Sequence, residues 1–206
     1  MRLCIVYLTL SIFLFIACKK ENTTPIPTVE TKPFTSKIDL EQLAFVPDSF
    51  LCTATKNVPG VGNLAWTANC DAYIVNDKYG KRLQLRFMTY EDSKSYYTRE
   101  TVGISGLPLK NGLSKVLSSE GVLDPNLIIF SGYARLLADG DVLDAYWRID
   151  NSQTSYVNIT NIDTLNKRVQ GSFDLHFKQT TQGKENLHST FINFKSGKFD
   201  SRISKY

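Results

Sequence analysis

The chain of 206 residues has little of the chemistry that enzymes use: it contains two histidines and four cysteines. It has no Gly-x-Ser-x-Gly nucleophile elbow, no His-Glu-x-x-His zinc motif and no phosphate-cradling loop. Four cysteines in this length are also too few for a disulfide-built scaffold. We therefore expect a protein that is not an enzyme. A hydrolase that uses two converging carboxylates stays open, because such pairs leave no sequence motif.

Charge of one sign is scarce as well. The 24 basic and 20 acidic residues give a net charge of +4, which is too weak for a nucleic-acid binder. The balance is uneven along the chain, with two basic and seven acidic residues in Val116–Leu165 but eight basic and three acidic residues in Asn166–Tyr206. We expect the C-terminal strands to be the side that faces an anionic partner or a membrane surface.

The sequence has one long hydrophobic run, from Leu3 to Ala17, preceded by Met1 and Arg2. At about fifteen residues it matches the core of a signal peptide and is too short for a comfortable membrane span. Its ending, Phe15-Ile16-Ala17-Cys18, resembles a bacterial lipobox, although lipoboxes usually carry leucine where Phe15 stands. We predict a signal peptide over residues 1–17 and lipid attachment, including palmitate, at Cys18. An ordinary secretory signal with an incidental cysteine is the alternative.

The segment after Cys18 has no apolar periodicity. Lys19–Lys37 contains three prolines among threonine, glutamate and lysine, which is typical of a disordered tether. Its 19 residues (37 − 18) would give a root-mean-square reach of about 25 Å. We therefore divide the chain into a signal peptide (1–17), a lipidated cysteine with its tether (18–37) and a single β-rich domain (38–206).

Two cysteines remain in the mature chain, Cys52 and Cys70. An exported protein occupies an oxidising compartment, where two remaining cysteines usually pair. The turn-rich stretch Val58–Asn63 lies between them and is suited to reversing a strand. We predict a Cys52–Cys70 disulfide, with two buried free thiols as the alternative.

Short alternating runs dominate the rest of the chain. Leu83, Leu85 and Phe87 alternate with polar residues, and the turn Asn76–Gly80 precedes them, which predicts a hairpin of Ala72–Val75 with Leu83–Thr89. Asp139-Gly140 is a strong two-residue hairpin signal. Centring the turn there places apolar or small pairs on one face: Leu136/Leu143, Ala134/Ala145, Gly132/Trp147 and Phe130/Ile149. The other face then carries the pairs Arg135/Asp144, Tyr133/Tyr146 and Ser131/Arg148.

The same pairing continues into a five-stranded antiparallel meander from Leu127 to Phe194. A turn at Asn151–Gln153 places Val157 opposite Trp147, and one face of the meander is apolar. That face needs a cover, which the strands between Phe50 and Leu117 would supply. We predict an all-β antiparallel β-sandwich, with a flattened β-barrel as the alternative.

The outer face of this meander is a candidate binding surface. Tyrosine, amide and guanidinium groups together suit a sugar or peptide, since tyrosine is flat, amphipathic and low in conformational entropy. An ordinary solvated sheet face is the alternative. The predicted binding face consists of Tyr133, Arg135, Tyr146, Arg148, Tyr156 and Asn158.

The two histidines are a candidate metal site, and three phenylalanines are a candidate lining for an apolar ligand. If the last hairpin centres on Gln182, His176 and His188 face each other beside Asp174, a set that could bind zinc. Two solvated strand histidines explain the same residues, so we predict no metal and no cofactor. A carrier of a small apolar ligand would need a wide lumen lined by Phe173, Phe177 and Phe191.

The C-terminal part of the chain resembles small envelope lipoproteins of Bacteroidota that contain domains of unknown function. The residues that carry the resemblance are Val157–Thr160, Asp163, Lys167–Phe173 and Gly197–Asp200. The resemblance implies a lipid-anchored protein of the cell envelope, at the outer membrane, whose periplasmic or surface orientation stays open. The function that follows is a non-enzymatic binding or accessory module with a glycan or protein partner. The alternatives are the apolar-ligand carrier and a hydrolase acting on envelope or extracellular glycans.

Overall fold

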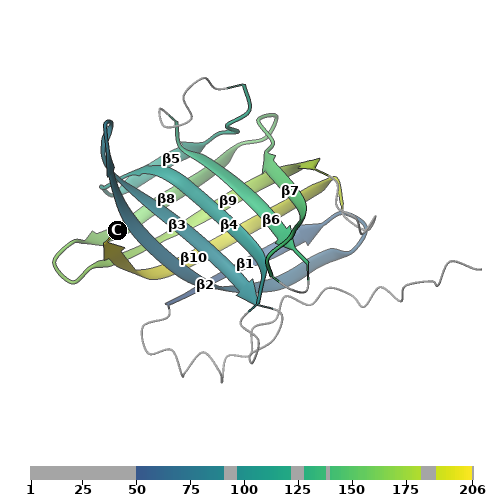
Figure 1. The fold of residues 1–206 in the computed structure, drawn as a ribbon, viewed down its shortest axis with the longest axis horizontal. Helices are drawn as coiled ribbons and strands as arrows, with labels where there is room; N and C mark the ends of the chain where they lie inside the picture. Colours follow the sequence, from purple (N-terminus) through teal and green to yellow (C-terminus); the bar gives the residue numbers. More distant parts are fainter. Residues whose placement is uncertain (1–49, 91–96, 122–127, 138–139, 182–188, 206) are drawn as a thin grey trace, which may run out of the picture. The chain divides into compact units, whose positions relative to one another are not determined.

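The computed structural model describes residues 50–90, 97–121, 128–137, 140–181 and 189–205. These residues belong to the compact unit Thr35–Tyr206, and the predicted signal peptide, tether and Cys18 lie outside them. They contain ten strands and no helix, and therefore no helix that could cross a membrane (Figure 1). The strands are β1 (Phe50–Val58), β2 (Gly62–Asp77), β3 (Gly80–Tyr90), β4 (Thr98–Pro108), β5 (Gly112–Val116), β6 (Phe130–Leu136), β7 (Leu143–Ile149), β8 (Ser155–Asp163), β9 (Arg168–Thr181) and β10 (Phe191–Lys205).

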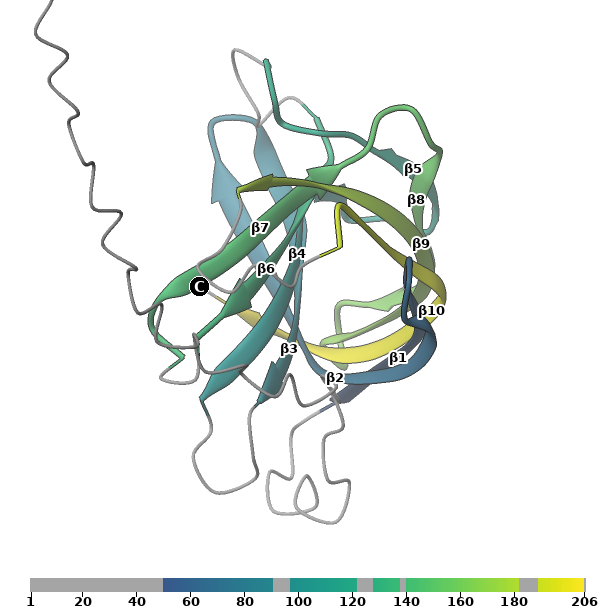
Figure 2. The ribbon, with the colours of Figure 1, turned by 90° about the vertical axis from the view of Figure 1, so that its right-hand side faces the viewer.

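Eight of the strands form a closed antiparallel barrel. Each pairs with the next in the order β1, β2, β3, β4, β6, β7, β9, β10, and β10 pairs back to β1. The view in Figure 2 shows these strands arranged around a common interior. The C-terminal end of β10 also forms a short parallel pairing with β2, from Ile203/Ala72 to Lys205/Ile74. The all-β class is confirmed, and the architecture is the barrel rather than the sandwich.

Strand β8 continues β7 along the same edge of β9. Residues 177–181 of β9 pair with β7, and residues 168–174 pair with β8. The turn at Asp150–Gln153, closed by a 3.0 Å hydrogen bond from Gln153 N to Asp150 O, therefore bends one long strand instead of reversing it. The predicted β7–β8 hairpin, with Val157 opposite Trp147, is wrong. Strand β5 extends the sheet beyond the barrel by pairing with β8.

The predicted hairpin of β2 with β3 is confirmed. Ala72 pairs with Leu85 and Ile74 with Leu83, and the turn begins after the Asp77/Gly80 pair. Leu83, Leu85 and Phe87 are buried in the barrel, as their alternation indicates.

The predicted register of the β6–β7 hairpin is correct at its tip and wrong beyond it. Leu136 pairs with Leu143, but a β-bulge follows and Arg135 then pairs with Ala145. The bulge turns both Asp144 and Ala145 inward, so Tyr133 pairs with Trp147 and not with Tyr146. The residue that lies against Gly132 is accordingly Tyr146, whose hydroxyl is 2.0 Å from where a Cβ at Gly132 would stand.

Aromatic rings fill the middle of the barrel. Strands β3 and β9 are four positions apart in a ring of eight and therefore face each other. Phe87 of β3 and Phe173 of β9 stack with ring centroids 5.1 Å apart, so side chains from opposite walls meet in the interior. An eight-stranded barrel is just wide enough to be filled in this way.

Gly197 of β10 makes room for one of these rings. A Cβ at this position would lie 2.4 Å from two carbons of the Phe173 ring, which is itself fully packed. A Cβ at Gly103 of β4, by contrast, would meet nothing within 4 Å. The two glycines therefore form a matched pair for testing how tightly the interior is packed.

We expect Gly197→Ala to lower the free energy of unfolding by about 1–3 kcal/mol, because the methyl group overpacks the core. Gly103→Ala should leave it unchanged or raise it slightly, since the substitution restricts the unfolded chain. Urea denaturation of both variants checks this, and equal effects at the two positions would contradict the close packing around Phe173.

Candidate functional site

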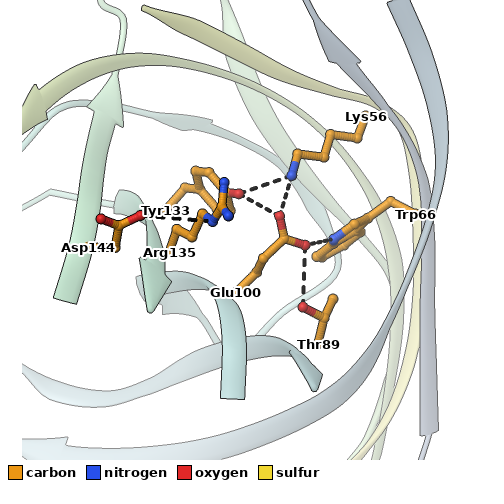
Figure 3. Close-up of polar contacts among 7 residues, drawn as sticks. All are labelled: Lys56, Trp66, Thr89, Glu100, Tyr133, Arg135 and Asp144. Carbon is orange, nitrogen blue, oxygen red and sulfur yellow. Dashed lines mark hydrogen bonds and ion pairs between the residues drawn. The ribbon is translucent and has the colours of Figure 1, made fainter. Parts of the chain in front are cut away.

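A cluster of polar and charged side chains lies inside the barrel, near the end where β1 joins β2 and β3 joins β4. We call it the Glu100 network. Its members come from five consecutive strands of the ring and are nearly or fully inaccessible to solvent, with 3% or less of each residue exposed. The members are Lys56 (β1), Trp66 (β2), Thr89 (β3), Glu100 (β4) and Tyr133 (β6) (Figure 3).

The Glu100 carboxylate is the centre of the network, because both of its oxygens accept hydrogen bonds. Oε2 accepts from Trp66 Nε1 at 2.8 Å and from Thr89 Oγ1 at 3.3 Å. Oε1 accepts from Tyr133 OH at 2.5 Å and forms an ion pair with Lys56 Nζ. Four donors on four other strands thus replace the water that a buried carboxylate loses.

Lys56 connects this carboxylate with Tyr133 on the facing strand. Strands β1 and β6 face each other across the ring, and Lys56 Nζ donates to Tyr133 OH at 3.0 Å. The ammonium also lies over the Tyr133 and Phe194 rings, 5.1 and 5.9 Å from their centroids. The ring faces and the carboxylate together surround the charge on Lys56.

Burial controls the ionisation of the network. Desolvation lowers the pKa of Lys56, and the attraction of Glu100 opposes this effect. Burial, and then the adjacent Glu100 carboxylate, raise the pKa of Tyr133 well above its ordinary value. Tyr133 therefore stays a neutral phenol that donates to Glu100.

A second ion pair lies beside the network. Arg135 Nε is 4.0 Å from Asp144 Oδ2, with 16% and 1% of the side chains exposed (Figure 3). The predicted Arg135/Asp144 pair thus exists, but the bulge places it in the barrel instead of on its outer face.

The predicted binding face is only partly assembled on the outside. Tyr133 is 1% exposed and Arg135 points inward, so both are corrections to the prediction, caused by the one-residue shift at the bulge. The other four, Tyr146, Arg148, Tyr156 and Asn158, alternate with buried neighbours and lie on the outer side. They form two groups beside β9: Tyr146 and Arg148 lie on β7, next to one part of β9, and Tyr156 and Asn158 lie on β8, next to the other part.

The predicted zinc ligands are engaged with other groups or lie outside the described residues. His176 Nδ1 is 2.9 Å from Asn193 Oδ1, and Asp174 accepts hydrogen bonds from Tyr156 OH and Ser196 N. His188 is among the residues that the structure does not describe. In the described part of the chain, no three His, Cys, Asp or Glu side chains are grouped to bind a metal.

Cys52 and Cys70 are buried free thiols in the structure, so the predicted disulfide is not confirmed. Cys52 pairs with Ala68 and Cys70 with Phe50, which places the two cysteines diagonally on neighbouring strands. Diagonal Cα atoms are about 7–8 Å apart, beyond the usual disulfide range. Burial, first of all, raises the pKa of both thiols.

Comparisons with known proteins identify no relative. No family model matches the chain, and neither a curated protein nor a solved structure is significantly similar to it.

Sequence reasoning missed the Glu100 network, although the alternation contained a signal. Glu100 continues the inward phase of Val102 and Ile104, and Lys56 continues that of Cys52. In a sequence, a charged residue at an inward-facing position is usually interpreted as the point where the strand ends. The arrangement shows that these charges belong to the core.

The network has the chemistry of a structural core, which double substitution can test. We expect Lys56→Met and Glu100→Gln each to lower the free energy of unfolding by about 3–5 kcal/mol, because each leaves a buried charge without its partner. The double variant should cost clearly less than the sum, since no buried charge is left over.

Urea denaturation of the two single variants and the double variant gives the coupling energy. If a single variant fails to fold and the double variant folds, this result also supports the pairing of Lys56 with Glu100. Costs that simply add would contradict the pairing of Lys56 with Glu100.

Proposed function

We propose that this protein is a lipid-anchored cell-envelope protein that acts as a non-enzymatic binding or accessory module. A signal peptide that ends at Cys18 would direct export and lipid attachment, and the Lys19–Lys37 tether would hold the barrel near the membrane. Several acyl chains on one cysteine make an anchor effectively permanent, at about 0.8 kcal/mol per buried CH₂. The barrel is then the part that meets a partner.

One observation carries the assignment of binding to the outer surface: side chains of this chain already contact one another across the barrel. Glu100 accepts four hydrogen bonds from the protein itself, and Phe173 stacks on Phe87 from the opposite wall. Phe177, which an apolar-ligand carrier would use, packs edge-on against Phe194 with centroids 5.9 Å apart. These contacts favour a filled interior and recognition by the outer face.

The absence of convergent chemistry among the described residues supports a non-enzymatic role. The buried carboxylates among the described residues are Glu100, which accepts four hydrogen bonds, and Asp144, which is paired with Arg135. A glycan hydrolase would need two carboxylates that flank a substrate.

Lipid attachment is tested by labelling the full-length protein with radioactive palmitate in a bacterial host. Cys18→Ala should abolish the label and release the protein from the membrane fraction, because the only acceptor thiol at the cleavage site is gone. The matched control Cys4→Ala removes a cysteine from the signal peptide and should leave the label unchanged. A labelled Cys18→Ala variant, or an unlabelled wild type, would contradict the anchor.

A further inference from the structure

A row of hydrogen-bonded polar side chains crosses four adjacent strands on the outside of the barrel. The residues are in register, because Asn57 pairs with both Asn63 and Asn193, and Asn193 pairs with His176. We call these four residues the asparagine row: Asn63 (β2), Asn57 (β1), Asn193 (β10) and His176 (β9).

The hydrogen bonds of the row run in one direction. Asn57 Nδ2 donates to Asn63 Oδ1 at 2.8 Å, and Asn193 Nδ2 donates to Asn57 Oδ1 at 3.5 Å. His176 Nδ1 lies 2.9 Å from Asn193 Oδ1 and donates to it in the tautomer that carries the ring proton on Nδ1. The neighbours thus hold the amides in fixed orientations.

Each central amide retains hydrogen-bonding capacity beyond the row. An asparagine has two N–H donors and two acceptor sites, and the row uses one of each at Asn57 and at Asn193. Donor and acceptor side by side on a fixed group are what neighbouring sugar hydroxyls require. The row therefore offers prearranged partners at little entropic cost.

Cations flank the row on its β7, β9 and β10 side. Lys178 is the next outward-facing residue of β9 after His176. It pairs with Arg148 of β7 on one side and with Phe191 of β10 on the other. Lys195 and Lys198 are exposed on β10, beyond Asn193.

The acids nearby are Asp174 and Asp150. Asp174 is held by Tyr156 and Ser196, and Asp150 accepts two hydrogen bonds from Ser152. Lys178 also attracts the Asp150 carboxylate, but Lys195, Lys198 and Arg148 still leave this face positive, and its three lysines belong to the basic C-terminal part of the sequence.

Phe191 adds an aromatic surface at the same place. It lies on the outer phase of β10, two residues from Asn193, and 37% of it is exposed. An exposed ring next to amides and cations can pack against the apolar face of a sugar.

We propose that the asparagine row, with Phe191 and the cations Arg148, Lys178 and Lys195, forms a surface site for an acidic saccharide such as a chain of uronic acids. The amides bind hydroxyls, the cations bind carboxylates and Phe191 packs against a ring face. The inference rests on the proposed function as a binding module and names its ligand class. It also places the binding surface farther around the barrel than the sequence does, toward β10 and β1.

Binding of hexagalacturonate to the full-length protein in detergent, measured by calorimetry, tests the proposal, with maltohexaose as the neutral probe. The double variant Lys178→Gln/Lys195→Gln should weaken hexagalacturonate binding at least about tenfold, the effect of losing one or two charge-assisted hydrogen bonds. Asn193→Ala should also weaken it about tenfold with an unchanged melting temperature. The matched control Lys81→Gln/Lys110→Gln removes two exposed charges elsewhere and should have no such effect.

Any of the following outcomes would overturn the proposed acidic-saccharide site. Equal binding of maltohexaose, or equal loss in the control pair, would show that neither acidity nor this surface matters. If hexagalacturonate does not bind but another glycan or peptide on an array does, unaffected by the row variants, the acidic-saccharide site is wrong and the binding module stands. If no glycan or peptide binds, both proposals fail.

Discussion

The fold depends on the burial of one carboxylate. Glu100 is fully enclosed in the barrel and receives its hydrogen bonds from four other strands. A carboxylate without these partners would cost several kcal/mol, so the strands that supply them must all be in place together. Lys56 and Tyr133 contribute most to this constraint, since they connect opposite walls of the ring.

This constraint separates the polar and apolar parts of the interior. The charges of Lys56 and Glu100 lie near the end where β1 joins β2, and the middle is filled by rings such as Phe87 and Phe173. Because both parts are occupied by the chain's own side chains, oriented polar groups that remain accessible lie on the outer face. The asparagine row lies on that face, and its members His176 and Asn193, with Lys178 and Lys195, belong to β9 and β10 in the basic part of the sequence.

Period-two alternation predicted most of the strands and the inward side of β3 and β9, because a half-buried strand must present one face to the core. It failed where a bulge intervened. The Asp139-Gly140 signal predicts only the tip of the β6–β7 hairpin. Because of the single extra residue at Asp144, β7 faces as predicted from Ala145 onward, whereas β6 presents Ser131 and Tyr133 to the core instead of Gly132 and Ala134. The Arg135–Asp144 pair is predicted from local sequence, but its position inside the barrel depends on closure of the ring and cannot be read from local sequence.

Native-state hydrogen exchange is the most direct test of the Glu100 network as the element that couples the barrel. The slowest amides of β1, β4 and β6 should share one opening free energy, and Glu100→Gln should lower it by the same amount in all three strands. If β1 opened at a much lower free energy than β4 and β6, and the substitution changed β4 alone, Glu100 would not hold the ring together.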